Sequence, residues 1–220
     1  MTYEDENIDK SHDTSHILPP LSFNIPKAAT QVLIGDSNLR KVDRKRLDPD
    51  GKTFVRSIGG LTILKATGML HHTESREDIT NVCVHVGTND IDQGKSQNEI
   101  IKDTRLLISE LKKTFPSANI GLTGMLPQKG IPSKRILELN QRLENLIKDE
   151  NLVFLWDKQD FFGKDSFPTH LFEKDKYHMN ERGVGVLLRR IKKIITTSEQ
   201  SDTQRNKIDK AKNTLSLPKK

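Results

Sequence analysis

The stretch from residue 31 to residue 38 reads Gln31-Val32-Leu33-Ile34-Gly35-Asp36-Ser37-Asn38. Its short apolar run is typical of a buried strand, and the glycine that follows predicts a turn at the end of that strand. Two more apolar runs have the same form, because residues 53–58 stop at Gly59 and residues 81–86 stop at Gly87. We therefore expect polar groups to follow three strands at one edge of a sheet, where open α/β folds expose their ligand-binding residues.

Strand and helix patterns alternate along the rest of the chain. Residues 119–123 and 152–156 favour two further strands, whereas residues 99–115 and 133–148 carry apolar side chains at helical spacing. A last helix is expected to begin near Asn180. This alternation predicts an α/β fold, a flavodoxin-like, doubly wound parallel sheet of about five strands with helices on both faces. The strand order 2-1-3-4-5 would place Ser37 and Asn89 across one crevice at the topological switch point.

Length and composition favour one folded domain with two tails. A chain of 220 residues with 33% hydrophobic residues can bury one sizeable core. Both ends are polar and poor in aromatic residues, so they cannot bury enough surface to offset the entropy of ordering. We expect a disordered tail at 1–27, a folded domain at 28–195 and a disordered basic tail at 196–220. The net charge of +6 is uneven, since residues 1–26 carry −4, residues 196–220 carry +3 and the remainder carries +7.

Composition also excludes or disfavours several protein classes. The single cysteine, Cys83, excludes an intramolecular disulfide framework and a multi-cysteine zinc site, and its place in an apolar run favours a core thiol. No apolar stretch follows Met1 or reaches the roughly 18 residues needed to cross a membrane. We therefore expect an intracellular, cytoplasmic protein without a membrane span. Asp90 and Asp92 lack the neighbouring ligands of a metal site, so we expect no metal and no cofactor.

Ser37 and a group of residues near the last helix have the chemistry of acyl transfer. Ser37 lies where a strand passes into a helix, but a serine hydroxyl is a poor nucleophile without a base. His178 is the preferred base because Asp175, three residues earlier, can orient the imidazole. His170 is a weaker alternative, since Phe167 takes the place of an acid three residues before it. The other interpretation of His178 is a histidine that only caps the last helix.

The expected oxyanion donors are the backbone amides of Ser37 and Gly60 and the side-chain amide of Asn89. Gly59 could replace Gly60 in this role, and a purely structural glycine pair is the other interpretation. Asn89 could instead close an Asx turn at the end of its strand. The neighbouring carboxylates of Asp36 and Asp90 are expected to hold their own turns by hydrogen bonds rather than to take part in chemistry.

Four motifs in this order resemble those of the SGNH, or GDSL, hydrolase superfamily of esterases and lipases. The matching positions are Gly35-Asp36-Ser37 for the first block, Gly60 for the second, Gly87-Thr88-Asn89-Asp90 for the third, and Asp175 with His178 for the last. The resemblance implies an SGNH hydrolase fold. It also implies a serine esterase that acts on a small-molecule, lipid or carbohydrate ester through an acyl-serine intermediate.

Two details refine this resemblance. The sequence His178-Met179-Asn180 together with Gly183 resembles the esterase-like domains found in LINE-type retrotransposon proteins. Leu61 departs from the superfamily pattern, which often has aspartate after the glycine block, so the geometry of that loop stays open. We expect loops such as 62–78 and 124–134 to form the walls of the substrate pocket.

A nucleic-acid-binding module is the competing interpretation. The superfamily includes a domain of the germ-plasm protein Oskar that lacks the catalytic set and binds RNA. Two segments of this chain carry basic residues that could contact phosphates, namely Arg40, Lys41, Arg44, Lys45, Arg189, Arg190, Lys192 and Lys193. They could equally be solvated helix faces. We keep weak nucleic-acid binding as a second activity, and the sequence does not indicate the oligomeric state.

Overall fold

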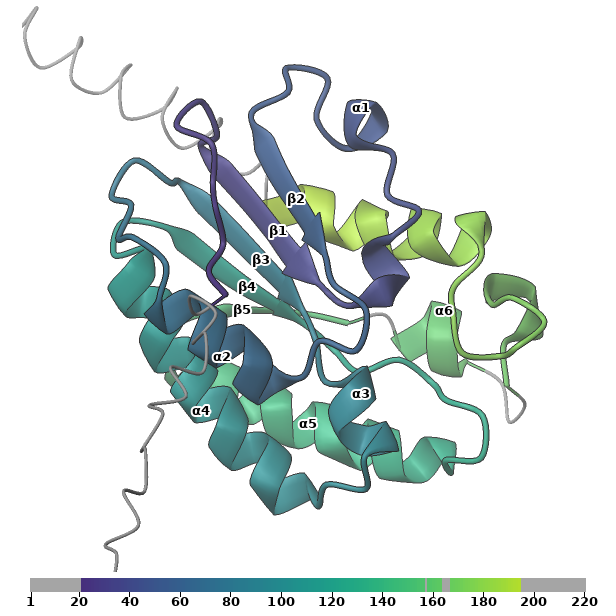
Figure 1. Cartoon of the computed structure of the whole chain (residues 1–220). Coiled ribbons are helices and arrows are strands. Elements are labelled where there is room, and N and C mark those ends of the chain that lie inside the picture. Colours follow the sequence, from purple (N-terminus) through teal and green to yellow (C-terminus); the bar gives the residue numbers. More distant parts are fainter. Residues whose placement is uncertain (1–20, 157, 164–166, 195–220) are drawn as a thin grey trace, which may run out of the picture.

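The computed structural model describes residues 21–156, 158–163 and 167–194 (Figure 1). Five parallel strands form a sheet in the order β2-β1-β3-β4-β5. Their bounds are Gln31–Gly35 for β1, Thr53–Ser57 for β2, Asn81–His85 for β3, Asn119–Thr123 for β4 and Val153–Leu155 for β5. The predicted α/β class, strand number and strand order are confirmed. Most of the two predicted tails, at 1–20 and 196–220, lies outside the described residues.

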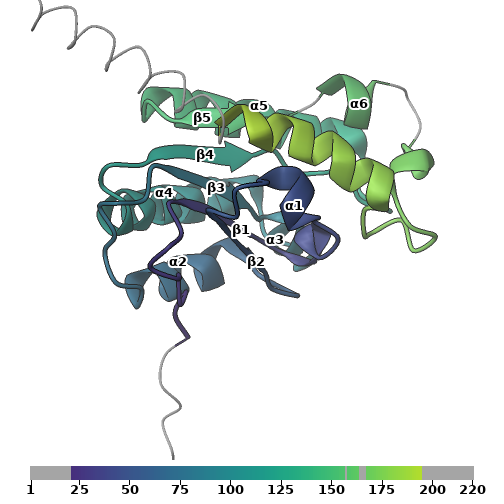
Figure 2. The same ribbon diagram turned by 90° about the horizontal axis from the view of Figure 1, so that it is seen from above.

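Helices cover both faces of the sheet (Figures 1 and 2). One face packs against α2 (Ile63–His71), α4 (Gln97–Thr114) and α5 (Ser133–Asp149). The other face packs against η1 (Ser37–Leu39), α1 (Arg44–Leu47) and a C-terminal helix at 181–194. The shorter helices α3 (Thr88–Asp92), α6 (Lys158–Phe162) and η2 (Thr169–Leu171) lie in the connections after β3 and β5.

Strand side chains alternate between the two cores. Val32 and Ile34 of β1 pack with α2, α4 and α5, whereas Leu33 between them packs with the C-terminal helix. Successive side chains of a strand point to opposite faces, so both faces of this covered sheet are apolar. Gly121 of β4 lets the C-terminal helix approach closely, because a Cβ atom there would lie 1.8 Å from Ile194 Cδ1.

The predicted helices are present, with small shifts at their ends. The helix expected from residue 99 begins at Gln97, because Ser96 and Glu99 form a capping box. The Ser96 hydroxyl accepts from the Glu99 amide, and the Glu99 carboxylate accepts from the Ser96 amide. Within the described ranges, no helix is both long enough and apolar enough to cross a membrane.

The segment at 62–78, expected to be a loop, instead contains α2. Thr62 caps the first turn by accepting from the Lys65 amide. Ile63, Ala66 and Leu70 are each 1% exposed and face the core. Their spacing of three and four residues was the available signal for a helix.

The chain already packs before the expected domain start at residue 28. Phe23 is 3% exposed, and its amide donates to Thr73 Oγ1 at 2.9 Å. The Arg76 guanidinium pairs with Asp78 and also binds four backbone carbonyl oxygens, those of Ile25, Pro26, Lys27 and Ala29. Arg76 therefore holds the N-terminal segment beside the start of the sheet.

Candidate active site

Ser37 begins the short helix η1 directly after β1. Its turn is held from both neighbouring strands, since the Asp36 amide donates to the His85 carbonyl oxygen at 3.1 Å and the Ser57 hydroxyl donates to the Asp36 carbonyl oxygen at 2.8 Å. The Asp36 carboxylate accepts from the Asn38 amide at 2.9 Å and so caps η1, as expected for Asp36. Ser37 is half-buried at the carboxyl end of β1.

Asp175 and His178 form a pair in the loop between η2 and the C-terminal helix. His178 Nδ1 lies 2.7 Å from Asp175 Oδ2, while Asp175 Oδ1 accepts from the amides of Tyr177 and His178 at 2.8 and 3.0 Å. Lys176 takes a left-handed φ of 58°, which lets the chain reverse direction here. The His178 ring, followed by the two amides, lowers the pKa of Asp175 to about 2. Its carboxylate is therefore ionised at neutral pH.

A buried hydrogen bond joins the Ser37 turn to the His178 loop. The Met179 amide donates to Asn38 Oδ1 at 3.1 Å, with Asn38 4% exposed and Met179 2% exposed. These residues directly follow the candidate nucleophile and the candidate base, although 141 positions separate them. Ser37 and His178, both within the described residues, form no hydrogen bond with each other, and such catalytic contacts are often long before substrate binds. Asn38 was not predicted as a site residue, although its position directly after Ser37 pointed to a role in the same turn.

The loops after β2 and β3 bring Gly60 and Asn89 together. The Asn89 side-chain amide donates to the Leu61 carbonyl oxygen at 3.0 Å, so it binds the loop that carries Gly60 rather than its own turn. Gly60 has a φ of 66°, a left-handed conformation that glycine adopts without a side-chain clash. The turn closes when the Leu61 amide donates to the Ile58 carbonyl oxygen at 3.3 Å. Because an amide nitrogen carries two hydrogens, Asn89 retains one for a further acceptor.

Asp90 also holds a neighbouring loop, which corrects the expectation that it holds its own turn. Its fully buried carboxylate accepts from the Ile63 amide at 2.9 Å and from Lys95 Nζ at 2.7 Å. On the other side, the Gln128 side-chain amide donates to the Thr88 carbonyl oxygen at 2.9 Å. Gln128 was not among the predicted site residues, and its role depends on a loop contact that carries no local pattern. Residues 87–90 are thus fixed from several directions.

The other histidines are less suited to act as the base. His170 lies exposed in η2, with its carbonyl oxygen accepting from the Asn180 side chain at 3.1 Å. His71 ends α2, with Nδ1 3.5 Å from a Glu110 carboxylate oxygen, and His85 is 1% exposed within the sheet. Among the described residues, His178 makes the shortest contact between a histidine and a carboxylate.

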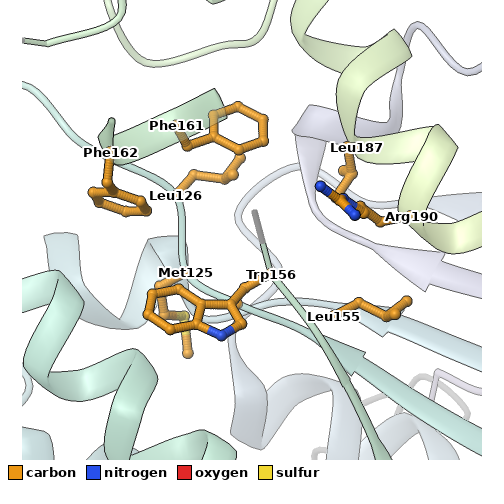
Figure 3. A pocket seen from close by; sticks show the side chains of 9 residues that line it. Met125, Leu126, Leu155, Trp156, Phe161, Phe162, Leu187 and Arg190 are labelled. Carbon is orange, nitrogen blue, oxygen red and sulfur yellow. The ribbon is translucent and has the colours of Figure 1, made fainter. Parts of the chain in front are cut away.

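Figure 3 shows an apolar pocket at the ends of β4 and β5. Trp156, Phe161 and Phe162 surround it on one side, and Leu187 and Arg190 of the C-terminal helix lie on the other. Its cavity volume is about 10 Å³, which leaves room for about one water molecule. In this conformation the pocket cannot admit an acyl chain.

The two basic segments of the sequence meet on the surface. A groove of about 660 Å³ lies between α1 and the C-terminal helix, which Figure 2 shows beside each other. The segments meet because Leu39 and Leu47 pack in the same apolar cluster as Leu187 and Ile191. The charged residues that line the groove are Lys41, Asp43, Arg46, Glu181, Arg182, Arg189 and Lys192, five basic and two acidic.

Only some of the eight predicted basic residues line this groove. Lys41, Arg189 and Lys192 do, whereas Arg40, Arg44, Lys45, Arg190 and Lys193 do not. Lys41 pairs with Glu173, Arg189 lies 3.5 Å from Asp160, and the Arg44 guanidinium donates to the Val55 carbonyl oxygen at 3.1 Å. The exposed Arg46 and Arg182 also line the groove but were not among the predicted contacts. Arg46 belongs to the same basic run as Arg44, whereas only the packing of the two helices places Arg182 there.

The fold is an α/β fold similar to that of solved GDSL-like lipases and esterases. A GDSL-like lipase from Bacteroides thetaiotaomicron is similar with a TM-score of 0.60 and 20% identity, covering 81% of this chain and 93% of that chain. The esterase EstA from Pseudoalteromonas sp., inhibited by monoethylphosphonate, gives 0.55 at 18% identity, with 78% and 99% covered. The OSK domain of Drosophila Oskar gives 0.57 at 20% identity, with 80% and 90% covered. At these identities the likeness is one of fold, and it confirms the predicted SGNH hydrolase fold.

The chain belongs to the OSK domain family, whose model matches residues 24–162. The matched range contains Ser37, Gly60 and Asn89 but ends before Asp175 and His178. No curated protein sequence matches the chain significantly. Family membership therefore says nothing about the candidate base, which has to be argued from the geometry.

Proposed function

We propose that this protein is a serine esterase of the SGNH type, which hydrolyses a carboxylic ester through an acyl-serine intermediate. The observation that carries the proposal is the hydrogen bond from the Met179 amide to Asn38 Oδ1. It joins the loop of the Asp175–His178 pair to the turn that presents Ser37. A nucleophile, a base and a carboxylate that orients the base are the groups that this kind of acyl transfer requires.

In the proposed reaction, Ser37 Oγ attacks the ester carbonyl carbon while His178 Nε2 takes the hydroxyl proton. Asp175 accepts a hydrogen bond from Nδ1–H and so leaves the lone pair on Nε2. His178 then gives its proton to the departing alcohol, and the acyl group remains on Ser37. A water molecule, deprotonated by His178, attacks the acyl carbonyl carbon, and the acid leaves as the serine hydroxyl is restored.

The negative charge that develops on the carbonyl oxygen needs nearby donors. We assign the amides of Ser37 and Gly60 and the remaining Asn89 amide hydrogen to this role, each contributing roughly 3–4 kcal/mol in the transition state. The contact of Asn89 with the loop of Gly60 supports this assignment. The substrate class that we propose is a small-molecule, lipid or carbohydrate ester.

Labelling of the purified full chain with a fluorophosphonate probe tests nucleophile activation without a known substrate. We expect covalent addition at Ser37, located by mass spectrometry of the proteolytic peptides, and no addition in Ser37→Ala. Ser117→Ala is a matched control that should keep the labelling, because Ser117 is an exposed serine just before β4, at the opposite end of the sheet. A folded wild-type protein that is not labelled at Ser37 would contradict the proposal.

Nucleic-acid binding is a second candidate function, favoured by the basic groove between α1 and the C-terminal helix. Five basic side chains against two acidic ones line its 660 Å³, and such a surface attracts phosphates with little dependence on base sequence. Titration of labelled single-stranded RNA at two salt concentrations tests this function. Binding should weaken steeply as salt rises, and no binding even at low salt would leave these residues as solvated helix faces.

A further inference from the structure

His85 is a buried histidine that the proposed mechanism does not use. It ends β3, is 1% exposed, and its Nδ1 lies 2.6 Å from the hydroxyl of Thr123 at the end of β4. Burial lowers the pKa of His85, although the Asp36 carboxylate opposes the effect, so the ring is neutral and carries one proton. Its Nε2 is buried and has no hydrogen-bond partner within the described part of the chain. Native structures rarely leave such a group unused, because its desolvation costs free energy.

That ring nitrogen lies beside the carboxylate that shapes the Ser37 turn. His85 Nε2 is 3.9 Å from Asp36 Oδ1, the oxygen that accepts from the Asn38 amide. Asp36 is also 1% exposed. The two residues are joined through the backbone as well, because the Asp36 amide donates to the His85 carbonyl oxygen at 3.1 Å. The same carboxylate also influences Tyr177, whose pKa is raised by burial and by Asp92 and Asp36.

We propose that His85 is a positioning residue for Ser37. The Thr123 hydroxyl lies 2.6 Å from Nδ1 and 3.5 Å from the Val84 carbonyl oxygen, so in this proposal it donates its single hydrogen over the shorter contact, to Nδ1. The ring proton then stays on Nε2, facing the Asp36 carboxylate across 3.9 Å. At 3.9 Å this contact is too long for a hydrogen bond. The N–H dipole of a neutral ring still attracts a carboxylate more strongly in a buried site than in water, and an oriented Asp36 keeps η1 capped. The effect extends toward His178, because Asn38 binds Asp36 through its amide and Met179 through its side chain. The catalytic consequence rests on the proposed esterase function.

Substitutions of His85 separate this role from simple packing. His85→Leu removes both ring nitrogens, whereas His85→Gln keeps an N–H group that can face Asp36. Cys83→Ala is the matched control, because Cys83 lies two positions earlier in β3, on the same face, and is 1% exposed. The measurement is the rate constant of fluorophosphonate labelling of Ser37 in each variant, corrected for the folded fraction.

We expect His85→Leu to react roughly 10- to 100-fold more slowly, since a displaced nucleophile loses much of its effective concentration. His85→Gln should recover part of the rate, and Cys83→Ala should react at close to the wild-type rate. On an activated ester, kcat should fall while KM stays the same. Equal rates in His85→Leu and the wild type, or an equal loss in Cys83→Ala, would overturn the proposal.

If His85→Leu does not fold, substitutions of Thr123 test the same proposal, because they change the hydroxyl that contacts His85 Nδ1. Thr123→Val removes the hydroxyl with little change in shape, whereas Thr123→Ser retains it. We expect the valine variant to lose labelling rate and the serine variant to keep it. Similar rates in both variants would count against a role for the ring contact.

Two further measurements do not depend on enzyme activity. The ring-nitrogen chemical shifts of His85 should show the Nε2–H tautomer, and the Asn38 amide should exchange with solvent faster in His85→Leu than in Cys83→Ala. An Nδ1–H tautomer or unchanged Asn38 exchange would overturn the proposal. If the wild-type protein fails to react with the probe, the esterase proposal fails, and these measurements still decide whether His85 holds the turn.

Discussion

The edge around Ser37 and the basic groove are held in different ways, although each joins segments that lie far apart in the sequence. At the Ser37 edge, buried side chains bind backbone amides of other loops, as Asn38 does with Met179 and Asp90 does with Ile63. In the groove, all but one of the charged residues are exposed, and Lys41, 44% exposed, already has an acidic partner.

This difference sets how each region should respond to substitution. A buried polar group that loses its partner cannot form a hydrogen bond with water instead, so the loss of one contact lowers stability and acts locally. Exposed ion pairs contribute little and are screened by salt, so a charged groove acts through its summed charge. The edge should therefore be sensitive to single atoms, and the groove to net charge.

The largest expected effect is the loss of ester turnover in Ser37→Ala and in His178→Ala. Each should lower kcat by up to roughly 10⁶, and the double variant should be little worse, because the nucleophile and the base act as one unit. Steady-state assays with a short activated ester, together with circular dichroism to verify folding, measure this. Full turnover in Ser37→Ala would show that the nucleophile is misassigned.

Asp175→Asn should have the next largest effect. The amide keeps the shape of the turn but cannot hold the imidazole in the required tautomer, so turnover should fall by up to ~10⁴. His170→Ala is the matched control and should keep its activity. The base assignment would be reversed if His170→Ala were inactive while His178→Ala remained active.

Asn38→Ala tests the bond that joins the two halves of the candidate site. It leaves the buried Met179 amide without its acceptor, so the free energy of unfolding should fall by about 1–3 kcal/mol, and labelling of Ser37 should slow. Urea denaturation measures the stability, and Asn145→Ala on the exposed side of α5 should change it by less than about 0.5 kcal/mol. Equal effects of the two substitutions would contradict the special role of Asn38.

Reversing charges in the groove should weaken RNA binding without changing ester turnover. Reversing Arg46 and Arg182 to glutamate should weaken RNA binding by at least ~10-fold at low salt. Lys65→Glu with Lys102→Glu makes the same change in net charge on α2 and α4, on the opposite face, and should weaken binding less. Fluorescence anisotropy measures both variants, and both should retain the turnover of a small neutral ester. Equal losses of affinity would show a diffuse charge effect rather than a binding groove.

The smallest expected effect is on acid stability. The folded-state pKa of Asp175 is lowered from its ordinary value of 3.8 to about 2, so the pair stabilises the fold above pH 3.8 and loses this contribution as the pH falls toward 2. The two side chains are 40% and 49% exposed, which limits the contribution to under ~1 kcal/mol. The difference in unfolding free energy between wild type and Asp175→Asn should therefore be constant near neutral pH and shrink in acid. A difference that grows toward low pH would contradict this sign.

Local patterns were sufficient for the sheet and for most of the candidate site. The strands at 31–35, 53–57 and 81–85 are short apolar runs with a glycine shortly after or at their end, and this signal needs no distant partner. Asp175 and His178 were recognisable together because they lie within one turn of chain. Helix α2 was missed even though its apolar positions follow a helical period, since a glycine and polar residues interrupt the segment.

By itself, the sequence determined the α/β class and the residue types available at the carboxyl edge, because apolar periodicity and glycine turns act over a few neighbouring residues. The strand order was expected by analogy with doubly wound folds and was confirmed only by the structure. Only the tertiary structure decided that Asn38 binds Met179, that the His85 ring lies 3.9 Å from the Asp36 carboxylate, and that α1 and the C-terminal helix line a basic groove. These contacts join segments whose separation in the chain carries no pattern. Their geometry arises when the two apolar cores pack and the remaining buried polar groups have to find partners.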